Sequence, residues 1–261
     1  MELRGTKMTP KEAFHLFCLP PRMPLARREE EVMERAKRVP IRHRGRQIES
    51  YLWGRGPLVV LAHGWGARAG TMTAFVDPLV EAGFSVLAQD HPGHGESEGD
   101  QCNALWVSEC WDIQADKHGP LHGAITHSFG SLGINLFHSR GGGLNKAVQL
   151  APFNEVVKRF IEFSAALDFD EAEEAAFLSY CDTWFGPGRL ANIKGELIAP
   201  LMKAEALIIH DEADQDIPPA DGQALAGAWP GAEFVLTRGL GHRRIVRDKG
   251  VLARTIDFLK S

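Results

Sequence analysis

The chain has little that would suit it to nucleic acid, to a membrane or to an oxidising compartment. Its 261 residues carry a net charge of −5, so no basic field is present to attract nucleic acid or an anionic membrane. No apolar run approaches membrane-spanning length, and the N-terminus is too charged for a signal peptide. The four cysteines form no CxxC pair and no metal-ligand spacing, which indicates reduced thiols. We therefore expect a cytoplasmic protein without nucleic-acid binding or membrane insertion.

Short apolar runs alternate with helical patterns along most of the chain. These runs are mostly continuous rather than alternating, which is typical of parallel strands covered by helices on both faces. The pattern predicts an α/β fold with a mostly parallel sheet flanked by helices. The predicted strands are residues 58–62, 84–88, 123–126, 147–150, 206–209 and 234–236, and the main predicted helices are residues 71–82, 105–117, 220–228 and 243–260. We also predict an antiparallel hairpin formed by residues 38–43 and 47–53, with its turn at Arg44-Gly45.

The alternation breaks once, between a strand ending near Ala151 and one beginning near Ala204. The gap of about fifty residues is too long for an ordinary connection, and it predicts helices over residues 156–167 and 171–184. Residues 153–185 are 24% aromatic against 8% for the whole chain, which predicts an apolar pocket beneath them. We expect a helical cap at residues 154–200, a core at residues 38–153 and 201–261, and a solvated helical leader at residues 1–37. The candidate pocket residues are Phe153, Phe160 and Trp184.

The run Thr126-His127-Ser128-Phe129-Gly130 lies between a predicted strand and a predicted helix. A serine at such a turn, with glycine two residues later, is typical of a nucleophile elbow, in which the hydroxyl projects clear of the backbone. Thr126 stands where a first glycine is usual. The alternative is a serine that caps an ordinary helix. The rest of the chain has to supply a base, an acid and an oxyanion hole.

A serine hydroxyl needs an adjacent base, and His242 is the favoured histidine. It follows Gly241 directly after the last predicted strand, at the sheet edge where the elbow lies. The alternative is a surface histidine that caps the last helix. An acid must also hold the tautomer of the base. Residues 210–218 offer four carboxylates after another strand; Asp214 is favoured because it lies mid-loop, Asp216 is second and Asp211 third.

Backbone amides are needed for the oxyanion that develops on an attacked carbonyl. The turn His63-Gly64-Trp65-Gly66 follows a predicted strand, and its glycines leave an amide free to point inward. We predict donors at the amides of Trp65 and Phe129. We interpret His63 as structural, and His127 as a pocket-wall or sheet-packing residue rather than a second base.

These motifs, taken in order, resemble the α/β-hydrolase superfamily across residues 38–261. The resemblance rests on residues 63–66, on the turn Asp90-His91-Pro92-Gly93-His94-Gly95-Glu96-Ser97, on the elbow, on residues 210–218 and on Gly241-His242. It implies the chain order Ser, acid, His, which Ser128, Asp214 and His242 meet. It also implies that His91 and His94 are structural, and we expect no metal and no cofactor.

The combined prediction is a serine hydrolase that cleaves a small-molecule ester with an apolar acyl or alkyl group, through an acyl-enzyme. A thioesterase, amidase or peptidase would use the same residues, and these alternatives stay open. A second class is a non-hydrolytic protein of this fold, either for cofactor-free oxidation or for ligand binding. A nucleotide binder fits poorly, because the glycine-rich turn after Leu61-Ala62 lacks the GxGxxG spacing.

Overall fold

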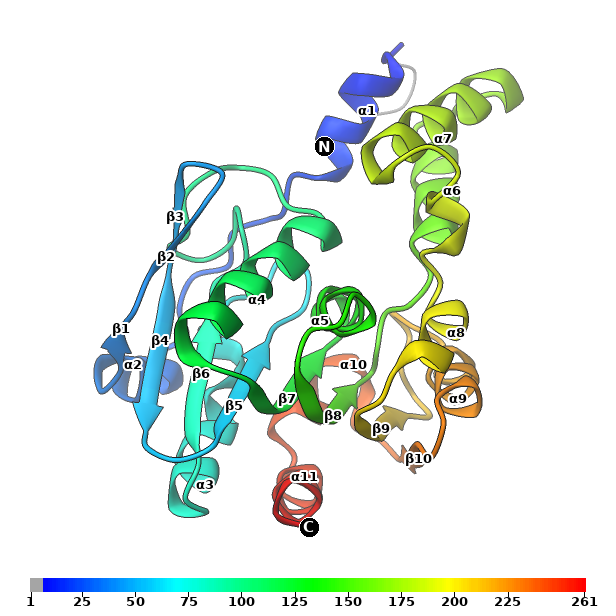
Figure 1. Ribbon diagram of the computed structural model, residues 1–261. Helices are drawn as coiled ribbons and strands as arrows, with labels where there is room; N and C mark the ends of the chain where they lie inside the picture. Colours follow the sequence, from blue (N-terminus) through cyan, green and yellow to red (C-terminus); the bar gives the residue numbers. More distant parts are fainter. Residues whose placement is uncertain (1–6) are drawn as a thin grey trace.

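The computed structural model describes residues 7–261 and is built on one eight-stranded sheet (Figure 1). The strand order is β1-β4-β6-β5-β7-β8-β9-β10; β1 and β4 run antiparallel to their neighbours, and the pairs from β6 to β10 are parallel. The strands are β1 Lys37–Arg38, β4 Ser50–Gly54, β5 Leu58–Ala62, β6 Ser85–Gln89, β7 Leu121–His127, β8 Leu144–Leu150, β9 Glu205–Asp211 and β10 Glu233–Thr237. All six predicted strands lie in β5 to β10.

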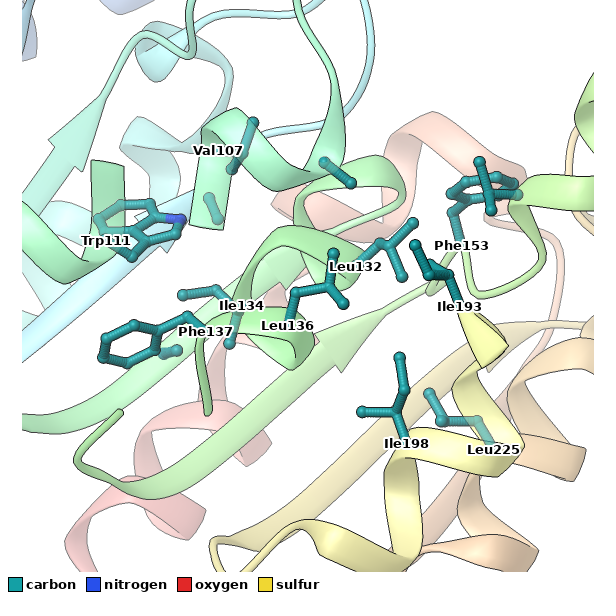
Figure 2. Close-up of a cluster of buried hydrophobic side chains, with 14 of the residues drawn as sticks. Val107, Trp111, Leu132, Ile134, Leu136, Phe137, Phe153, Ile193, Ile198 and Leu225 are labelled. Carbon is teal, nitrogen blue, oxygen red and sulfur yellow. The ribbon is translucent and has the colours of Figure 1, made fainter. Parts of the chain in front are cut away.

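Helices cover both faces of the sheet, as the continuous apolar runs predict. Alternate residues of β5 belong to two separate clusters: Val60 packs with helices α4 and α5, whereas Val59 and Leu61 pack toward η1, α3 and α11. Figure 2 shows the first cluster, in which Trp111 of α4 and Phe137 of α5 lie among aliphatic side chains. The core helices are η1 Ala69–Phe75, α3 Val76–Glu81, α4 Ala104–His118, α5 Phe129–Ser139, α9 Pro219–Ala228, α10 Gly241–Arg244, η4 Ile245–Arg247 and α11 Lys249–Lys260. The predicted α/β class is confirmed.

Two local predictions differ from the structure. The hairpin is confirmed for β2 (Ile41–His43) and β3 (Arg46–Ile48), where Arg44 and Gly45 have positive φ angles of 50° and 78°. Its predicted second strand ends early, because residues 50–54 leave the hairpin and pair with β6 in the main sheet. The predicted last helix is also interrupted, since the Asp248 carboxylate accepts from the Gly250 and Val251 amides and starts α11 there.

The segment between β8 and β9 is helical. It holds α6 Val156–Ala166, α7 Glu171–Phe185, η2 Leu190–Asn192, α8 Gly195–Ile198 and η3 Ala199–Leu201. Helices α6 and α7 lie next to α1, away from the body of the sheet (Figure 1). These are the residues for which the sequence predicts a cap.

The N-terminal segment is only partly solvated, in contrast to the solvated helical leader predicted for residues 1–37. Residues 1–6 lie outside the described part of the chain, and the segment after them holds α1 Pro10–Phe17 and α2 Arg27–Glu34. Ala13, Phe14 and Cys18 are buried, because α1 packs on α7 and α6 through aromatic contacts. The prediction rested on the charged residues of this segment, which are concentrated in α2, and overlooked the apolar residues in and next to α1. No helix within residues 7–261 is long and apolar enough to cross a bilayer.

Candidate active site

Ser128 lies at the turn between β7 and α5 in a backbone conformation that only a tight turn explains. Its φ is 51° and its ψ is −122°, a region that residues with a side chain seldom adopt. Its amide donates to the Leu150 carbonyl at 3.0 Å, and its own carbonyl accepts from Phe153 at 3.1 Å. The neighbouring chain therefore holds the strained residue in place.

Gly130 allows α5 to approach the strand beside it. A Cβ atom there would lie 2.4 Å from the Ala62 carbonyl oxygen and 2.7 Å from that of His63, so glycine is required. Thr126 replaces the first elbow glycine without conflict. Its hydroxyl lies 2.8 Å from the hydroxyl of Ser131, within the same turn.

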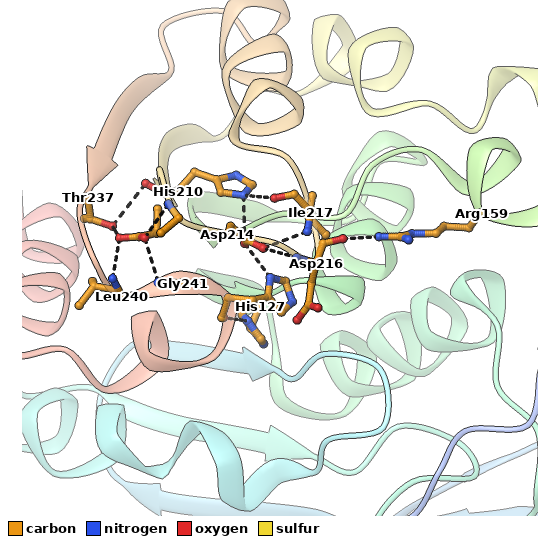
Figure 3. Close-up of polar contacts among 12 residues, drawn as sticks. His127, Arg159, His210, Asp214, Asp216, Ile217, Thr237, Leu240 and Gly241 are labelled. Carbon is orange, nitrogen blue, oxygen red and sulfur yellow. Dashed lines mark hydrogen bonds and ion pairs between the residues drawn. The ribbon is translucent and has the colours of Figure 1, made fainter. Parts of the chain in front are cut away.

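The candidate base and acid are in direct contact. Nδ1 of His242 lies 2.7 Å from Oδ2 of Asp214, and because a carboxylate only accepts, this nitrogen carries the proton. Figure 3 shows Asp214 with His210, Asp216 and Ile217 around it. The basic lone pair is then on Nε2. The other Asp214 oxygen accepts from the amides of Asp216 and Ile217, both at 2.9 Å.

Asp214 stays ionised in this setting. Burial alone would raise its pKa, but hydrogen bonds from His210, His242 and the Ile217 amide outweigh burial and hold the pKa well below its ordinary value. His210 is fully buried, and its Nε2 lies 3.2 Å from Asp214 Oδ2. Of the three carboxylates ranked from the sequence, Asp214 is the one in contact with His242.

Asp211, the third-ranked acid, holds the loop that carries His242. One of its oxygens accepts from the Thr237 hydroxyl at 2.8 Å and the Leu240 amide at 3.0 Å. The other accepts from the amides of Gly241 at 2.9 Å and Ala213 at 3.0 Å. This buried carboxylate therefore ties the acid loop to the histidine loop. Burial would raise its pKa, but these hydrogen bonds lower it overall.

His127 supports the same loop from the elbow side. Its Nε2 donates to the backbone carbonyl of His242 at 2.8 Å, and the two ring centroids are 4.7 Å apart. Burial, together with the nearby His242 ring, lowers the pKa of His127 to about 3, so this ring stays neutral. It borders the cavity described below.

The amides of Trp65 and Phe129 are available for an oxyanion. Within residues 7–261 neither amide donates a hydrogen bond, and Phe129 is the first residue of α5, where helix amides lack internal partners. The two rings lie edge to face with centroids 5.1 Å apart, so the residues are neighbours. The Ser128 hydroxyl and His242 share no hydrogen bond in the described residues, and such contacts are often long before substrate binds.

His63, His91 and His94 form a buried cluster behind this turn. The His91 amide donates to Nε2 of His63 at 3.0 Å, and the Gly66 amide donates to Nε2 of His94 at 3.1 Å. Burial lowers the pKa of His63 and His94 to about 3 and holds that of His91 well below its ordinary value. The rings thus serve as neutral partners for backbone groups of the two turns.

A cavity of about 1070 Å³ opens onto Ser128, His127 and His242. Phe153 and Phe160 line it, as the sequence predicts. Trp184 does not belong to the lining. The structure corrects that prediction, because the Trp184 ring packs on Phe14 and on Trp106 of α4 and is 37% exposed.

A family model described as "Serine aminopeptidase, S33" matches residues 56–186, half of the chain. The chain belongs to this family. It is therefore an α/β-hydrolase, as the ordered motifs predict.

The proteins similar to this α/β-hydrolase match different shares of its chain. Over 44 residues it is 52% identical to a pimeloyl-(acyl-carrier protein) methyl ester esterase of Methylococcus capsulatus, a match of 17% of either chain. An esterase structure from Pyrococcus furiosus covers 93% of this chain and 98% of its own, with a TM-score of 0.70 and 17% identity. An enol-lactonase structure from Burkholderia xenovorans covers 85% and 100%, with a TM-score of 0.65 and 19% identity. At these identities the two structures establish the α/β-hydrolase fold.

Sequence reasoning missed two parts of the hydrolase site. The first is Asp211 as the anchor of the histidine loop, a residue that the sequence ranked only as the third candidate acid. The second is the N-terminal segment, whose residues from Phe14 to Val32 contribute to the cavity wall. The signal that could have pointed to this segment was its short cluster of apolar residues, Phe14, Leu16 and Phe17.

Proposed function

We propose that this α/β-hydrolase is a serine hydrolase that cleaves ester-type acyl bonds, with Ser128 as nucleophile, His242 as base and Asp214 as the acid that orients it. The observation that carries the proposal is the 2.7 Å contact of His242 with Asp214 beside a serine in the elbow conformation, with Ser128 and His242 on one cavity. A serine that only capped a helix would need neither the strained φ nor an oriented histidine.

In the first half-reaction the Ser128 oxygen attacks the ester carbonyl carbon while Nε2 of His242 takes the hydroxyl proton. The amides of Trp65 and Phe129 hold the oxyanion, and each such donor is worth about 3 kcal/mol in the transition state. The carbon–oxygen bond to the leaving alcohol then breaks, and the alcohol departs with the proton from His242. An acyl-Ser128 ester remains.

In the second half-reaction a water molecule gives a proton to Nε2 of His242 and attacks the acyl-enzyme carbonyl. Collapse of the intermediate releases the carboxylic acid, and the proton returns to the Ser128 oxygen. Asp214 stays ionised throughout and stabilises the imidazolium that forms twice in the cycle. Its lowered pKa supports this role.

The cavity supports an ester with an apolar acyl or alkyl group. The Phe153, Phe160, Phe163 and Phe129 side chains border the space beside Ser128. A thioester or an amide would be attacked by the same groups, and the family description names an aminopeptidase. The aromatic lining supports the apolar group, and we choose the ester because the Methylococcus capsulatus relative, 52% identical over 44 residues, is a methyl ester esterase. All four cysteines are buried free thiols, which supports a cytoplasmic location.

Labelling with a fluorophosphonate tests the nucleophile. This reagent phosphonylates only an activated serine, so wild type should label and Ser128→Ala should not. The matched control is Ser139→Ala, which removes a hydroxyl at the far end of α5, bonded there to the Leu136 carbonyl at 3.1 Å, and should keep labelling. Equal labelling of wild type and Ser128→Ala would refute the mechanism, and absence of labelling in wild type would favour a non-hydrolytic protein.

Hydrolysis rates over p-nitrophenyl esters, acyl-CoA thioesters and aminoacyl amides test the bond class. We expect the highest kcat/KM on esters with unbranched alkyl acyl groups. Faster cleavage of aminoacyl amides would replace the esterase by an aminopeptidase while leaving the nucleophile unchanged.

A further inference from the structure

The N-terminal segment, here residues 9–34, lies across the active-site side of the molecule. Figure 1 shows it running from α1 beside the cap helices to α2 at the far edge of the sheet. The Arg22 guanidinium donates to the carbonyls of Gly95, Ser97 and Gly99 at 2.5–3.0 Å, and the Trp53 indole donates to Val32 at 2.9 Å. The segment is therefore fixed to the core along its length.

The segment also approaches the turn that supplies the oxyanion amide. A Cβ atom at Gly66 would lie 2.8 Å from Cγ of Pro21, so the Gly66 backbone packs closely on the Pro21 ring there. The Cys102 amide donates to the Cys18 carbonyl at 2.8 Å on the other side. Residues 18–21 are thus held between the oxyanion turn and the start of α4.

Phe17 is the residue of this segment that joins the cap to the oxyanion turn. Its ring centroid lies 4.6 Å from Phe160 and 5.3 Å from Phe163, both on α6, and 6.5 Å from Trp65. It is half-buried and borders the cavity, so one side of the ring is free to meet a ligand. Phe14, one turn earlier, is only 3% exposed and packs into the cap behind it.

The cavity lining is aromatic in one part and charged in others. Phe17 borders it together with Phe160 and Phe163 of α6, whereas α2, α10 and η4 contribute charged residues of both signs, Arg28, Glu29, Arg243 and Arg247. Arg159 of α6 also lines the cavity, with its guanidinium 5.9 Å from the Phe153 ring centroid. An alkyl chain gains free energy only against apolar side chains. The part bordered by Phe17, Phe160 and Phe163 is therefore the acyl end, and the charged parts suit a polar leaving group.

We propose that Phe17 of the N-terminal segment is a specificity-determining residue that closes the acyl end of the cavity and sets the longest acyl chain accepted. The proposal rests on the proposed esterase function. It assigns the substrate class as straight-chain acyl esters, whose chain lies between Phe17 and the α6 aromatics. Longer chains have to displace the Phe17 ring from its aromatic contacts.

The test compares chain-length profiles of wild type, Phe17→Ala and Phe17→Trp. The readouts are kcat/KM on p-nitrophenyl esters of increasing acyl length and, in a Ser128→Ala background, calorimetric binding of the matching free fatty acids. Phe17→Ala should move the optimum to chains at least about two carbons longer, and Phe17→Trp should shorten it, with changes of about tenfold in kcat/KM per methylene. Phe258→Ala, a truncation on α11, is the matched control and should keep the wild-type profile.

The outcomes separate the two proposals. An unchanged profile in folded Phe17→Ala, or the same fold-loss at every chain length, would overturn the role of Phe17. If Phe17→Ala fails to fold, Phe17→Leu must still lengthen the preference, and an unchanged profile there counts against the proposal. Failure of wild type to label with fluorophosphonate would overturn the esterase function, whereas fatty-acid binding reports on the cavity without hydrolysis.

Discussion

At the scale of single residues, the candidate site depends on two buried carboxylates, each of which accepts several hydrogen bonds. Asp214 accepts from His242 and two amides and lies 3.2 Å from Nε2 of His210, and Asp211 accepts from one hydroxyl and three amides. Asp214 touches the base itself, and Asp211 acts through the backbone that leads to it. Asp211 is thus a positioning residue, and its effect on activity passes through His242.

Asp211→Asn should separate positioning from chemistry. The amide cannot accept at its nitrogen, so either the Thr237–Leu240 side or the Gly241–Ala213 side loses its acceptor. We expect kcat/KM to fall about a hundredfold through displacement of His242, and the free energy of unfolding to fall by about 2 kcal/mol. Steady-state kinetics and urea unfolding measure the two effects.

The control for Asp211→Asn is Glu212→Gln, at the next residue. Within residues 7–261 the exposed Glu212 carboxylate pairs only with exposed Arg238, at 3.3 Å, so both kcat/KM and stability should stay at the wild-type level. A loss of stability in Asp211→Asn without any fall in kcat would contradict the positioning role.

At the scale of elements, the elbow depends on the close contact between α5 and the end of β5. Gly130→Ala would place a methyl group 2.4 Å from the Ala62 carbonyl oxygen, and backbone cannot move aside as a flexible side chain can. We expect a loss of about 3 kcal/mol in the free energy of unfolding. Fluorophosphonate labelling should fall as well, because Ser128 and the Phe129 amide would shift with the helix.

Gly227→Ala is the same substitution at another position, and there we expect it to stabilise the protein rather than destabilise it. Gly227 lies in α9 with no atom within 4 Å of an added Cβ, so alanine should raise the free energy of unfolding by up to about 1 kcal/mol. Urea unfolding of both variants measures the contrast. Similar effects of the two substitutions would show that the close approach at Gly130 does not constrain the fold.

The strands of the sheet centre and the order of the candidate residues could be predicted from the sequence, because both are local patterns. Continuous apolar runs such as 58–62 mark strands buried on both faces, and glycines mark the turns after them. The side-chain contacts of α1 could not be predicted in this way. Phe14 and Phe17 are buried or half-buried by α6 and α7, residues more than a hundred positions away, so their own neighbourhood carries no sign of it.

The same limit explains the error at Trp184. An aromatic residue in a predicted cap either lines the cavity or packs elsewhere, and composition does not distinguish the two. Trp184 packs on Phe14 and on Trp106 of α4, with ring centroids 5.2 and 5.8 Å away. Phe160 turns inward from a helix of the same cap. Where an aromatic ring of the cap packs is decided by contacts with segments that are distant in the sequence.

At the scale of the whole molecule, the buried histidines tie stability to pH. His63, His91, His94 and His127 are buried, and burial holds each pKa at about 3 or, for His91, well below the ordinary value. In the unfolded chain these histidines take up protons near pH 6.5. Between about pH 6.5 and pH 3 the unfolded state therefore binds more protons than the folded state.

The free energy of unfolding should consequently fall as the pH is lowered through this window. Each histidine contributes a slope of about 1.4 kcal/mol per pH unit once its unfolded form is charged. Urea titrations at several pH values measure the slope. His94→Gln offers the discriminating variant, because glutamine can accept from the Gly66 amide but binds no proton, so the slope should decrease by one proton. An unchanged slope would mean that His94 is protonated in the folded protein, and the neutral cluster behind the oxyanion turn would then be wrong.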